Sequence, residues 1–140
     1  YSRGPHMIMI TGSRSWTDEG TIRVILRGLP RNTTILHGGC DRGADAIADK
    51  VARELGFTVE VMPADWGRHG RAAGPIRNAA MAERCLSAIA FWDGVSAGTL
   101  SAINECTKRG KLCDVIAADR TPTQRSKVKA LCHGAKNGRR

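Results

Sequence analysis

The chain has 140 residues, of which 41% are hydrophobic, and a formal net charge of +9. This length suits a single domain whose core forms without help from a metal or disulfides. No apolar run approaches the roughly 18 residues of a membrane-spanning helix, and no signal peptide is recognisable, so we expect a soluble, cytoplasmic protein.

The basic charge is unevenly distributed along the chain. Residues 7–118 carry 14 Lys and Arg against 12 Asp and Glu, whereas residues 119–140 carry 7 against 1. We interpret residues 119–140 as a basic, largely disordered tail and residues 1–6 as the remnant of an expression tag. The folded domain then comprises residues 7–118, and the net charge says little about what that domain binds.

The cysteines are odd in number and lack C-x-x-C spacing, which argues against a disulfide framework and against a zinc site. We therefore expect reduced thiols and no metal. The five are Cys40, Cys85, Cys106, Cys113 and Cys132.

Residues 7–11 form a short apolar run that predicts a strand buried on both faces, and the run stops at a turn at residues 12–14. A helix is predicted next, with Thr17 as its N-cap and with Gly28 and Pro30 at its end. Its apolar face has helical spacing and consists of Ile22, Ile25, Leu26 and Leu29.

Residues 33–37 are rich in β-branched side chains and predict the second strand. A glycine-bearing loop at residues 38–43 leads into a second helix, which Gly56 ends. Residues 58–62 predict the third strand. The apolar face of the second helix consists of Ala44, Ile47, Ala48, Val51, Ala52 and Leu55.

The chain is organised around residues 63–81. Their first half is rich in Gly, Arg and His, and we interpret it as a loop. Gly74-Pro75 then begins a helix, because proline fits a first turn whose N–H groups lack intrahelical partners. Arg77 and Asn78 in that turn add donors to the positive end of the helix dipole. We interpret the stretch as a phosphate-binding lid, the alternative being a solvated loop with scattered arginines.

Residues 87–92 predict a fourth strand, a helix after the loop at residues 93–99 ends near Gly110, and residues 112–117 predict a fifth strand. This alternation predicts an α/β fold: a single Rossmann-like domain with a five-stranded, mostly parallel sheet and helices on both faces. Ligands of such sheets bind beyond the carboxyl ends of the strands. All four strand-to-helix loops contain glycine. Glycine is common in loops in general, which would explain one such loop but explains four at one edge of the sheet less well.

Glycines in the loop Gly38-Gly39-x-x-x-Gly43 allow the backbone to approach a phosphate held at the following helix start, although a plain turn would also contain them. The loop is neither G-x-G-x-x-G nor a Walker A sequence, so we predict neither a standard NAD site nor ATP hydrolysis. Trp66 and Trp92 lie at strand ends where an indole could stack on a base; Trp92 could equally close the core.

Five motifs in register together resemble the YspA-like, cpYpsA-related branch of the SLOG superfamily. The resemblance implies a Rossmann-like domain that binds nucleotides or nucleotide-derived ligands, phosphoribosyl or ADP-ribose-like, often as a homo-oligomer. It covers residues 7–116. The motifs are Gly12-Ser13-Arg14, His37-Gly38-Gly39-x-x-x-Gly43-Ala44-Asp45, Pro63-Ala64-Asp65-Trp66, Ala73-Gly74-Pro75-x-Arg77-Asn78-x-x-Met81 and Phe91-Trp92-x-x-x-Ser96-x-Gly98-Thr99.

The predicted ligand-binding residues follow from these loops and from the resemblance. They are Gly12, Ser13, Arg14, Gly38, Gly39, Gly43, Ala44, Asp45, Trp66, Gly74, Arg77, Asn78, Met81, Trp92, Ser96, Gly98 and Thr99.

Part of the sequence is similar to the LONELY GUY phosphoribohydrolases, which use Arg-Lys-x-x-Met and Pro-Gly-Gly-x-Gly-Thr-x-x-Glu. Arg77-Asn78-x-x-Met81 resembles the first motif, and Gly98-Thr99 match part of the second, but Ala102 stands at the position of the acid. Glycosidic cleavage needs a carboxylate to stabilise the cation or activate water. The candidate catalytic residues are Arg77, Asp45, Asp65 and Glu105.

Three functions stay open at this point. The first is a binding module for a phosphorylated nucleotide or an ADP-ribose-like signal. The second is a nucleotide N-glycosidase or phosphoribohydrolase. The third is nucleic-acid binding through the basic tail, whose Lys and Arg would contact phosphates.

Overall fold

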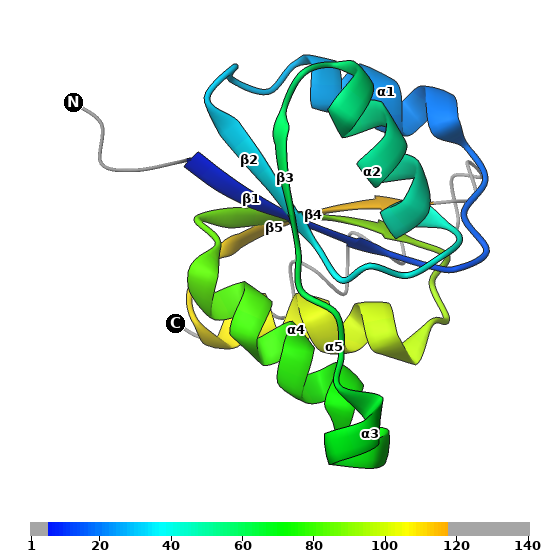
Figure 1. Cartoon of the computed structure of the whole chain (residues 1–140), viewed down its shortest axis with the longest axis vertical. Helices are drawn as coiled ribbons and strands as arrows, with labels where there is room; N and C mark the ends of the chain where they lie inside the picture. The colour runs from blue at the N-terminus through cyan, green and yellow to red at the C-terminus, as the bar shows by residue number, and fades with distance from the viewer. Residues whose placement is uncertain (1–5, 118–140) are drawn as a thin grey trace.

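The computed structural model describes residues 6–117 (Figure 1). Its five strands are all parallel, in the order β3-β2-β1-β4-β5. The predicted α/β fold is confirmed, and the predicted tail lies outside the described residues. The elements are β1 (His6–Gly12), α1 (Glu19–Arg27), β2 (Thr33–His37), α2 (Ala44–Glu54), β3 (Thr58–Val61), α3 (Trp66–His69), the 3-10 helix η1 (Gly70–Ala72), α4 (Ala73–Arg84), β4 (Ser87–Trp92), α5 (Ala97–Lys108) and β5 (Leu112–Ala117).

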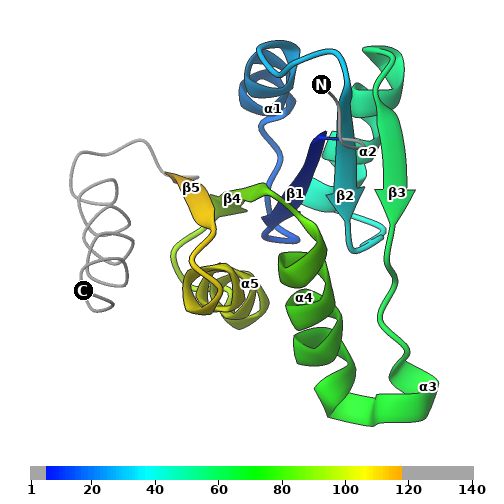
Figure 2. The same ribbon diagram turned by 90° about the vertical axis from the view of Figure 1, so that its left-hand side faces the viewer.

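Helices cover both faces of the sheet. Helices α1 and α2 lie on one face and α4 and α5 on the other, as Figures 1 and 2 show from two directions. The chain therefore leaves β1 toward one face and the neighbouring strand β4 toward the opposite face. A crevice is expected between the carboxyl ends of β1 and β4, because that is where the winding reverses.

The core has two halves, one on each face of the sheet. Ile8 and Ile10 of β1 pack on the α1 and α2 side, whereas Met9 packs on the α4 and α5 side. The strand is thus buried on both faces, as its unbroken apolar run predicts. Burying each of these side chains stabilises the fold by about 1.5–3 kcal/mol.

The N-cap of α1 is Asp18, so the prediction of Thr17 was wrong. The Asp18 carboxylate accepts a hydrogen bond from the backbone N–H of Thr21 at 3.0 Å. The helix starts at Glu19, and the residue immediately before it is the one whose side chain reaches the unpaired amides of the first turn. At the end of α2, Gly56 has φ +87° and fills the predicted position beyond the C-cap.

Residues 66–72, in the first half of residues 63–81, are helical, which corrects the prediction of a loop. Asp65 caps α3 by accepting from the backbone N–H of Arg68 at 3.1 Å, and Gly70, with φ +56°, ends it. Helix α3 lies farther from the sheet than α4 does (Figure 2). A four-residue helix is too short to produce the apolar periodicity by which longer helices are recognised.

Helix α4 starts at Ala73, so Pro75 lies in its first turn as predicted. Arg77 and Asn78, however, lie in the second turn rather than the first, because the helix begins before Gly74-Pro75. Their contribution to the site must therefore come from their side chains rather than from amides at the helix start.

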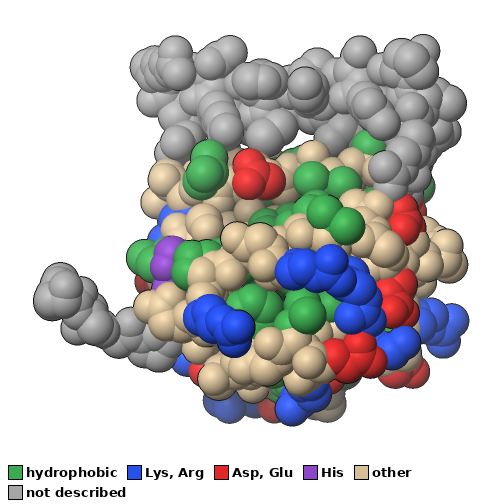
Figure 3. Space-filling view, turned by 90° about the horizontal axis from the view of Figure 1, so that it is seen from above, with side chains coloured by type: hydrophobic (Ala, Val, Ile, Leu, Met, Phe, Trp, Pro, Cys, Tyr) green, Lys and Arg blue, Asp and Glu red, His purple; other side chains and the backbone are tan. Residues whose placement is uncertain are grey.

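The outer surface of α1 and α2 carries charges of both signs (Figure 3). Arg23 pairs with Glu19 at 2.8 Å and with Glu54 at 2.6 Å, and Lys50 pairs with Glu19 at 3.0 Å. Partly exposed pairs of this kind contribute roughly 0–1 kcal/mol each to stability.

Within residues 6–117, no helix is long and apolar enough to cross a bilayer.

Candidate functional site

A cavity of about 620 Å³ lies at the carboxyl edge of the sheet. All four strand-to-helix connections contribute to it, so the glycine-bearing loops converge as predicted. Its volume lies within the range of small-molecule sites. The cavity is lined by Thr11, Gly12, Ser13, Arg14, Ser15, Gly38, Cys40, Asp45, Trp66, Gly74, Pro75, Arg77, Asn78, Met81, Asp93, Ser96, Ala97, Gly98, Thr99 and Ser101.

Ser13 joins three of these loops. Its backbone N–H donates to Phe91 O at 2.9 Å, and its carbonyl accepts from Ala44 N at 3.1 Å. Its hydroxyl oxygen accepts from Asp93 N at 3.0 Å. With its main-chain groups used in this way and its side chain buried, Ser13 holds the ends of β1 and β4 and the start of α2 at fixed positions around the cavity.

Asp93 organises the loop before α5. Its carboxylate accepts from the backbone N–H groups of Val95 and Ser96 at 2.9 and 2.8 Å and from the Ser96 and Ser15 hydroxyls at 2.9 and 3.2 Å. Burial by itself raises the pKa of Asp93, but these donors outweigh burial and lower the pKa to about 2. Asp93 is therefore an ionised carboxylate whose oxygens are occupied within the protein.

Two amide donors of the Gly38–Gly43 loop, and the first amide of the helix that follows, have partners within the protein. Gly39 N–H donates to His37 Nδ1 at 3.0 Å, and Cys40 N–H donates to Asp45 Oδ2 at 3.3 Å. The first amide of α2, on Ala44, donates to Ser13 O. A phosphate at this loop would have to displace these bonds, so the predicted use of this helix start is the weaker option.

His37 is buried and makes two hydrogen bonds. Its Nδ1 accepts from Gly39 N–H, and its Nε2 lies 2.7 Å from Asp49 Oδ2. An Nδ1 that accepts carries no proton, so the proton lies on Nε2 and points to Asp49. His37 thus holds the Gly38–Gly43 loop in place through these hydrogen bonds, and it does not line the cavity.

Asp45 lines the cavity although only 8% of its surface is exposed. Burial raises its pKa, and the Cys40 N–H and the Arg77 charge act in the opposite direction without cancelling the effect. Asp45 and Asp93 therefore lie in one cavity with pKa values shifted in opposite directions. Such a difference is typical of carboxyl groups with different roles.

Arg77 connects α4 to the end of β2. Its Nη1 donates to Gly38 O at 2.7 Å, and its Nε donates to Asn78 Oδ1 at 3.0 Å. Asn78 is buried and donates through Nδ2 to Gly98 O at 3.2 Å. The guanidinium is thus fixed at the cavity wall, and its Nη2 has no hydrogen-bond partner within the described residues.

The start of α5 is the open helix end of the site. No side chain caps it, and within residues 6–117 the N–H groups of Ala97, Gly98 and Thr99 have no partner. All three residues line the cavity. A Cβ added at Gly98 would meet nothing within 4 Å, so the space beside this residue is open. Unpaired amides at a helix start, carrying the positive end of its dipole, form an anion site.

The tryptophans differ in their surroundings. Trp66 is 55% exposed and lines the cavity, where it lies beside Gly74. Trp92 is buried, and its indole N–H donates to Ser96 O at 3.0 Å. Trp16 is buried against Phe91, with ring centroids 5.3 Å apart and planes at 60°. Of the three, only Trp66 lines the cavity.

Most of the predicted ligand-binding residues meet at the cavity. Four predicted ligand residues do not line it, namely Gly39, Gly43, Ala44 and Trp92, and neither do the catalytic candidates Asp65 and Glu105. Asp65 caps α3, and Glu105 pairs with Arg109 at 2.7 Å. The lining residues that sequence reasoning missed are Thr11, Ser15, Cys40, Pro75, Asp93, Ala97 and Ser101.

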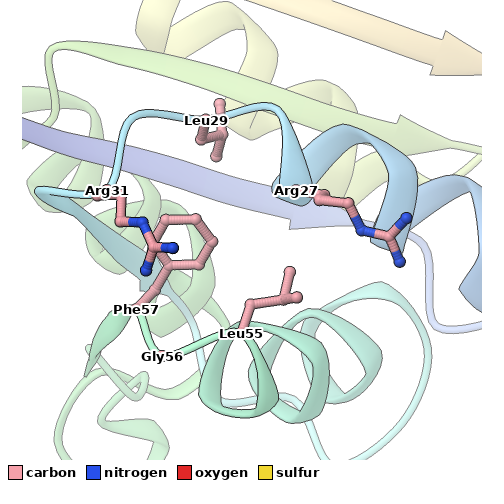
Figure 4. A pocket seen from close by; sticks show the side chains of 6 residues that line it. All are labelled: Arg27, Leu29, Arg31, Leu55, Gly56 and Phe57. Atoms are coloured by element: carbon pink, nitrogen blue, oxygen red, sulfur yellow. The ribbon is translucent and has the colours of Figure 1, made fainter.

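A second hollow lies at the opposite, amino-terminal edge of the sheet (Figure 4). It measures about 150 Å³ and is formed by the loops before β2 and β3. The hollow is lined by Arg27, Leu29, Arg31, Leu55, Gly56 and Phe57. Its size and its place away from the carboxyl ends of the strands argue against a nucleotide site there.

No group of three or more His, Cys, Asp or Glu within residues 6–117 could hold a metal ion.

Comparison with known proteins identifies the family. The family model of YAcAr, the YspA, cpYpsA-related SLOG family, matches residues 6–69. Gene 61 protein of Mycobacterium phage D29 is 41% identical over 116 residues, which cover 74% of this chain and 90% of that protein. The chain belongs to the YAcAr family. The match of the family model runs from β1 to the end of α3 and includes the first two loops of the cavity.

The fold of this YAcAr protein is similar to that of a solved structure. DNA processing protein A (DprA) from Streptococcus pneumoniae superposes with a TM-score of 0.73 at 17% sequence identity. The match covers 94% of this chain and 56% of the DprA chain, so the YAcAr chain spans little more than half of that protein. At this identity the likeness supports the Rossmann-like fold.

Proposed function

We propose that this YAcAr protein binds a nucleotide or a nucleotide-derived ligand in the cavity at the carboxyl edge of its sheet. The observation that carries the proposal is the start of α5. Three unpaired amides, on Ala97, Gly98 and Thr99, face the same cavity that an exposed indole, Trp66, lines. A nucleotide has a phosphate and a flat base. The amides can bind the phosphate, and the indole can stack on the base.

The phosphate belongs at the α5 start for reasons of charge and access. The amides there are free, whereas those of Gly39, Cys40 and Ala44 are already bonded. Arg14 is exposed on the cavity wall and supplies a cation that can reach an anion by side-chain rotation. Arg77, held by Gly38 O, adds positive charge at a fixed point.

The base belongs at Trp66. An indole whose ring is exposed gains by stacking against a base, at about 1–3 kcal/mol per base. Asp65 fixes the start of the short helix that carries Trp66, and Gly74 lies against the ring. The ring is therefore presented on ordered backbone.

Calorimetry tests the proposal with a panel of nucleoside mono- and diphosphates and ADP-ribose. We expect at least one to bind with a Kd below 1 mM, and Arg14→Ala to weaken it about tenfold. Arg27→Ala is the matched control, because Arg27 is also exposed but lines the hollow at the opposite edge. Absence of any binder, or equal losses from the two variants, would contradict the proposal.

A second candidate function is hydrolysis of the N-glycosidic bond, which Asp45 favours. Its carboxyl group is buried in the cavity, and burial raises its pKa, a property of groups that transfer protons near neutral pH. Chromatography of nucleotide incubations tests this function. Free base that disappears with Asp45→Asn supports it, and no free base at high protein concentration rejects it.

A further inference from the structure

We propose that Asp45 accepts hydrogen bonds from the sugar hydroxyls of the ligand, so that the site selects ribose over 2′-deoxyribose. This inference rests on the proposed nucleotide binding and specifies the class of nucleotide.

The hydrogen bonding of Asp45 leaves room for ligand donors. Cys40 N–H donates to Oδ2 at 3.3 Å, and Gly38 contributes a second backbone donor. An ionised carboxylate has about four acceptor positions. Within the described residues Asp45 has no side-chain donor and no ion pair, in contrast to Asp93, whose oxygens are occupied. A carboxylate that is 92% buried and short of donors gains from hydroxyl groups brought by a ligand.

The strand order places Asp45 between the two ends of the proposed ligand. Trp66 follows β3, Asp45 follows β2, and the open amides of Gly98 and its neighbours follow β4. Because the sheet runs β3-β2-β1-β4, the β2 connection lies between the other two along the rim of the cavity. In a nucleotide the sugar lies between the base and the phosphate. A base on Trp66 and a phosphate at α5 therefore bring the sugar past Asp45.

Charge excludes the other orientation. A phosphate beside Asp45 would place two anions together in a buried site, which is unfavourable, whereas a hydroxyl is a neutral donor. The free amides that suit the phosphate lie instead at the α5 start, and the exposed Arg14 lines the same cavity. Hydrogen bonds to a charged group are the stronger kind, so loss of one hydroxyl should be measurable.

The test compares four ribonucleoside 5′-monophosphates with their 2′-deoxy counterparts by calorimetry on the wild-type chain. We expect the best ribonucleotide to bind at least about tenfold more tightly than its deoxy form. Equal affinity for the two forms would overturn this inference while leaving nucleotide binding intact. Failure of all eight to bind would overturn this inference, and the proposed function would fall with it only if the diphosphates and ADP-ribose also failed to bind.

Variants identify the residue that discriminates. Asp45→Asn should reduce the ribose preference to less than about threefold, mostly by weakening the ribonucleotide. Asp41→Asn is the control, because Asp41 is an exposed acid in the same loop that does not line the cavity. An unchanged preference in Asp45→Asn would overturn the assignment. The wild-type comparison needs no variant, so the inference stays testable even if Asp45→Asn folds poorly.

Discussion

At the scale of single residues, the glycines around the cavity have two different roles. A Cβ at Gly12 would lie 2.6 Å from Phe91 O and would also collide with the Ala44 side chain. A Cβ at Gly38 would collide with the Arg77 guanidinium. These glycines are needed by the packing of the protein itself. Gly98 has no such neighbour and no positive φ, so neither packing nor backbone strain requires glycine there.

Gly98→Ala should therefore separate binding from stability. We expect the free energy of unfolding to be unchanged or to rise by about 0.5–1 kcal/mol, because alanine favours a helix over glycine. Nucleotide affinity should fall, because the methyl group adds bulk at the cavity wall beside the proposed phosphate position. Gly12→Ala is the contrast, with a loss of about 1–3 kcal/mol from overpacking. Urea unfolding and calorimetry measure both quantities, and unaltered affinity in Gly98→Ala would contradict the site.

Asp45→Asn gives a second prediction at this scale. Burial raises the pKa of Asp45 in the folded state, so its ionised form disfavours folding, and the stability associated with its protonated form is lost as pH rises through the folded pKa. At pH 7 the neutral amide should leave the free energy of unfolding unchanged or higher. Thermal unfolding measures this, and a loss above about 1.5 kcal/mol would mean that the carboxylate stabilises the fold instead.

At the scale of elements, a side chain in one strand-to-helix loop fixes the position of a neighbouring loop and of the helix that follows. Asp93 binds the first amides of its own loop and the Ser15 hydroxyl of the β1 loop, and so sets where α5 begins. The helix start is left uncapped because the acceptor lies three residues before Ser96 rather than at the N-cap. The geometry of the anion site thus depends on a carboxylate that needs no ligand.

Asp93→Asn should destabilise the protein by about 1–2 kcal/mol at pH 7, because the neutral amide makes weaker hydrogen bonds to the Val95 and Ser96 amides than the carboxylate does. Because the pKa of Asp93 is lowered to about 2, its stabilising contribution is present above the ordinary pKa near 3.9 and is lost as pH falls through about 2. The difference from wild type should therefore shrink between about pH 4 and pH 2. Denaturant unfolding across this range tests the prediction, with the exposed Asp114→Asn as control; a constant difference would contradict it.

Sequence patterns predicted the elements with a clear period and missed those held by single hydrogen bonds. The strands β2, β4 and β5 have the predicted bounds, because apolar and β-branched runs define them. Helix α3 was missed, although Asp65 three residues before Arg68 is a capping pattern that could have indicated it.

The sequence predicted the site residues whose position follows from the order of strands and loops. It did not predict which of the side chains are buried and which are exposed. Strand ends and glycine loops brought Ser13, Arg77 and Gly98 to one cavity. The same reasoning could not show that Trp92 is covered on its face of a central strand whereas Trp66 is exposed. Nor could it show that the Gly39 and Cys40 amides are used by His37 and Asp45, since both side chains must fold back onto their own loop.

At the scale of the whole molecule, the reversal of winding between β1 and β4 places the cavity at one edge and leaves the core closed elsewhere. The exposure of the cysteines is consistent with this arrangement. Cys85, Cys106 and Cys113 are buried, whereas Cys40 is partly exposed and lines the cavity. Hydrogen bonding with Cys113 and burial raise the pKa of Cys106 to about 12, and contact with Cys106 together with burial also raises the pKa of Cys85. Thiols of this kind react slowly because little thiolate is present.

Iodoacetamide at pH 8 should therefore modify Cys40 first in a Cys132→Ser background. The buried thiols should react only at the rate of unfolding, and a bound nucleotide should slow the reaction of Cys40. Mass spectrometry of digested protein after timed labelling gives the rates. Labelling of Cys85 or Cys106 as fast as Cys40 would contradict the closed core.

Amide chemical shifts in a ¹⁵N-labelled sample, followed during titration with the tightest-binding nucleotide, test the location of the site most directly. We predict the largest shifts at Ala97, Gly98 and Thr99 and at the indole N–H of Trp66, with smaller shifts at Gly39 and Ala44, whose amides are already bonded. Shifts centred instead on Leu29, Leu55 and Phe57 at the amino-terminal edge would contradict a nucleotide site at the carboxyl ends of the strands.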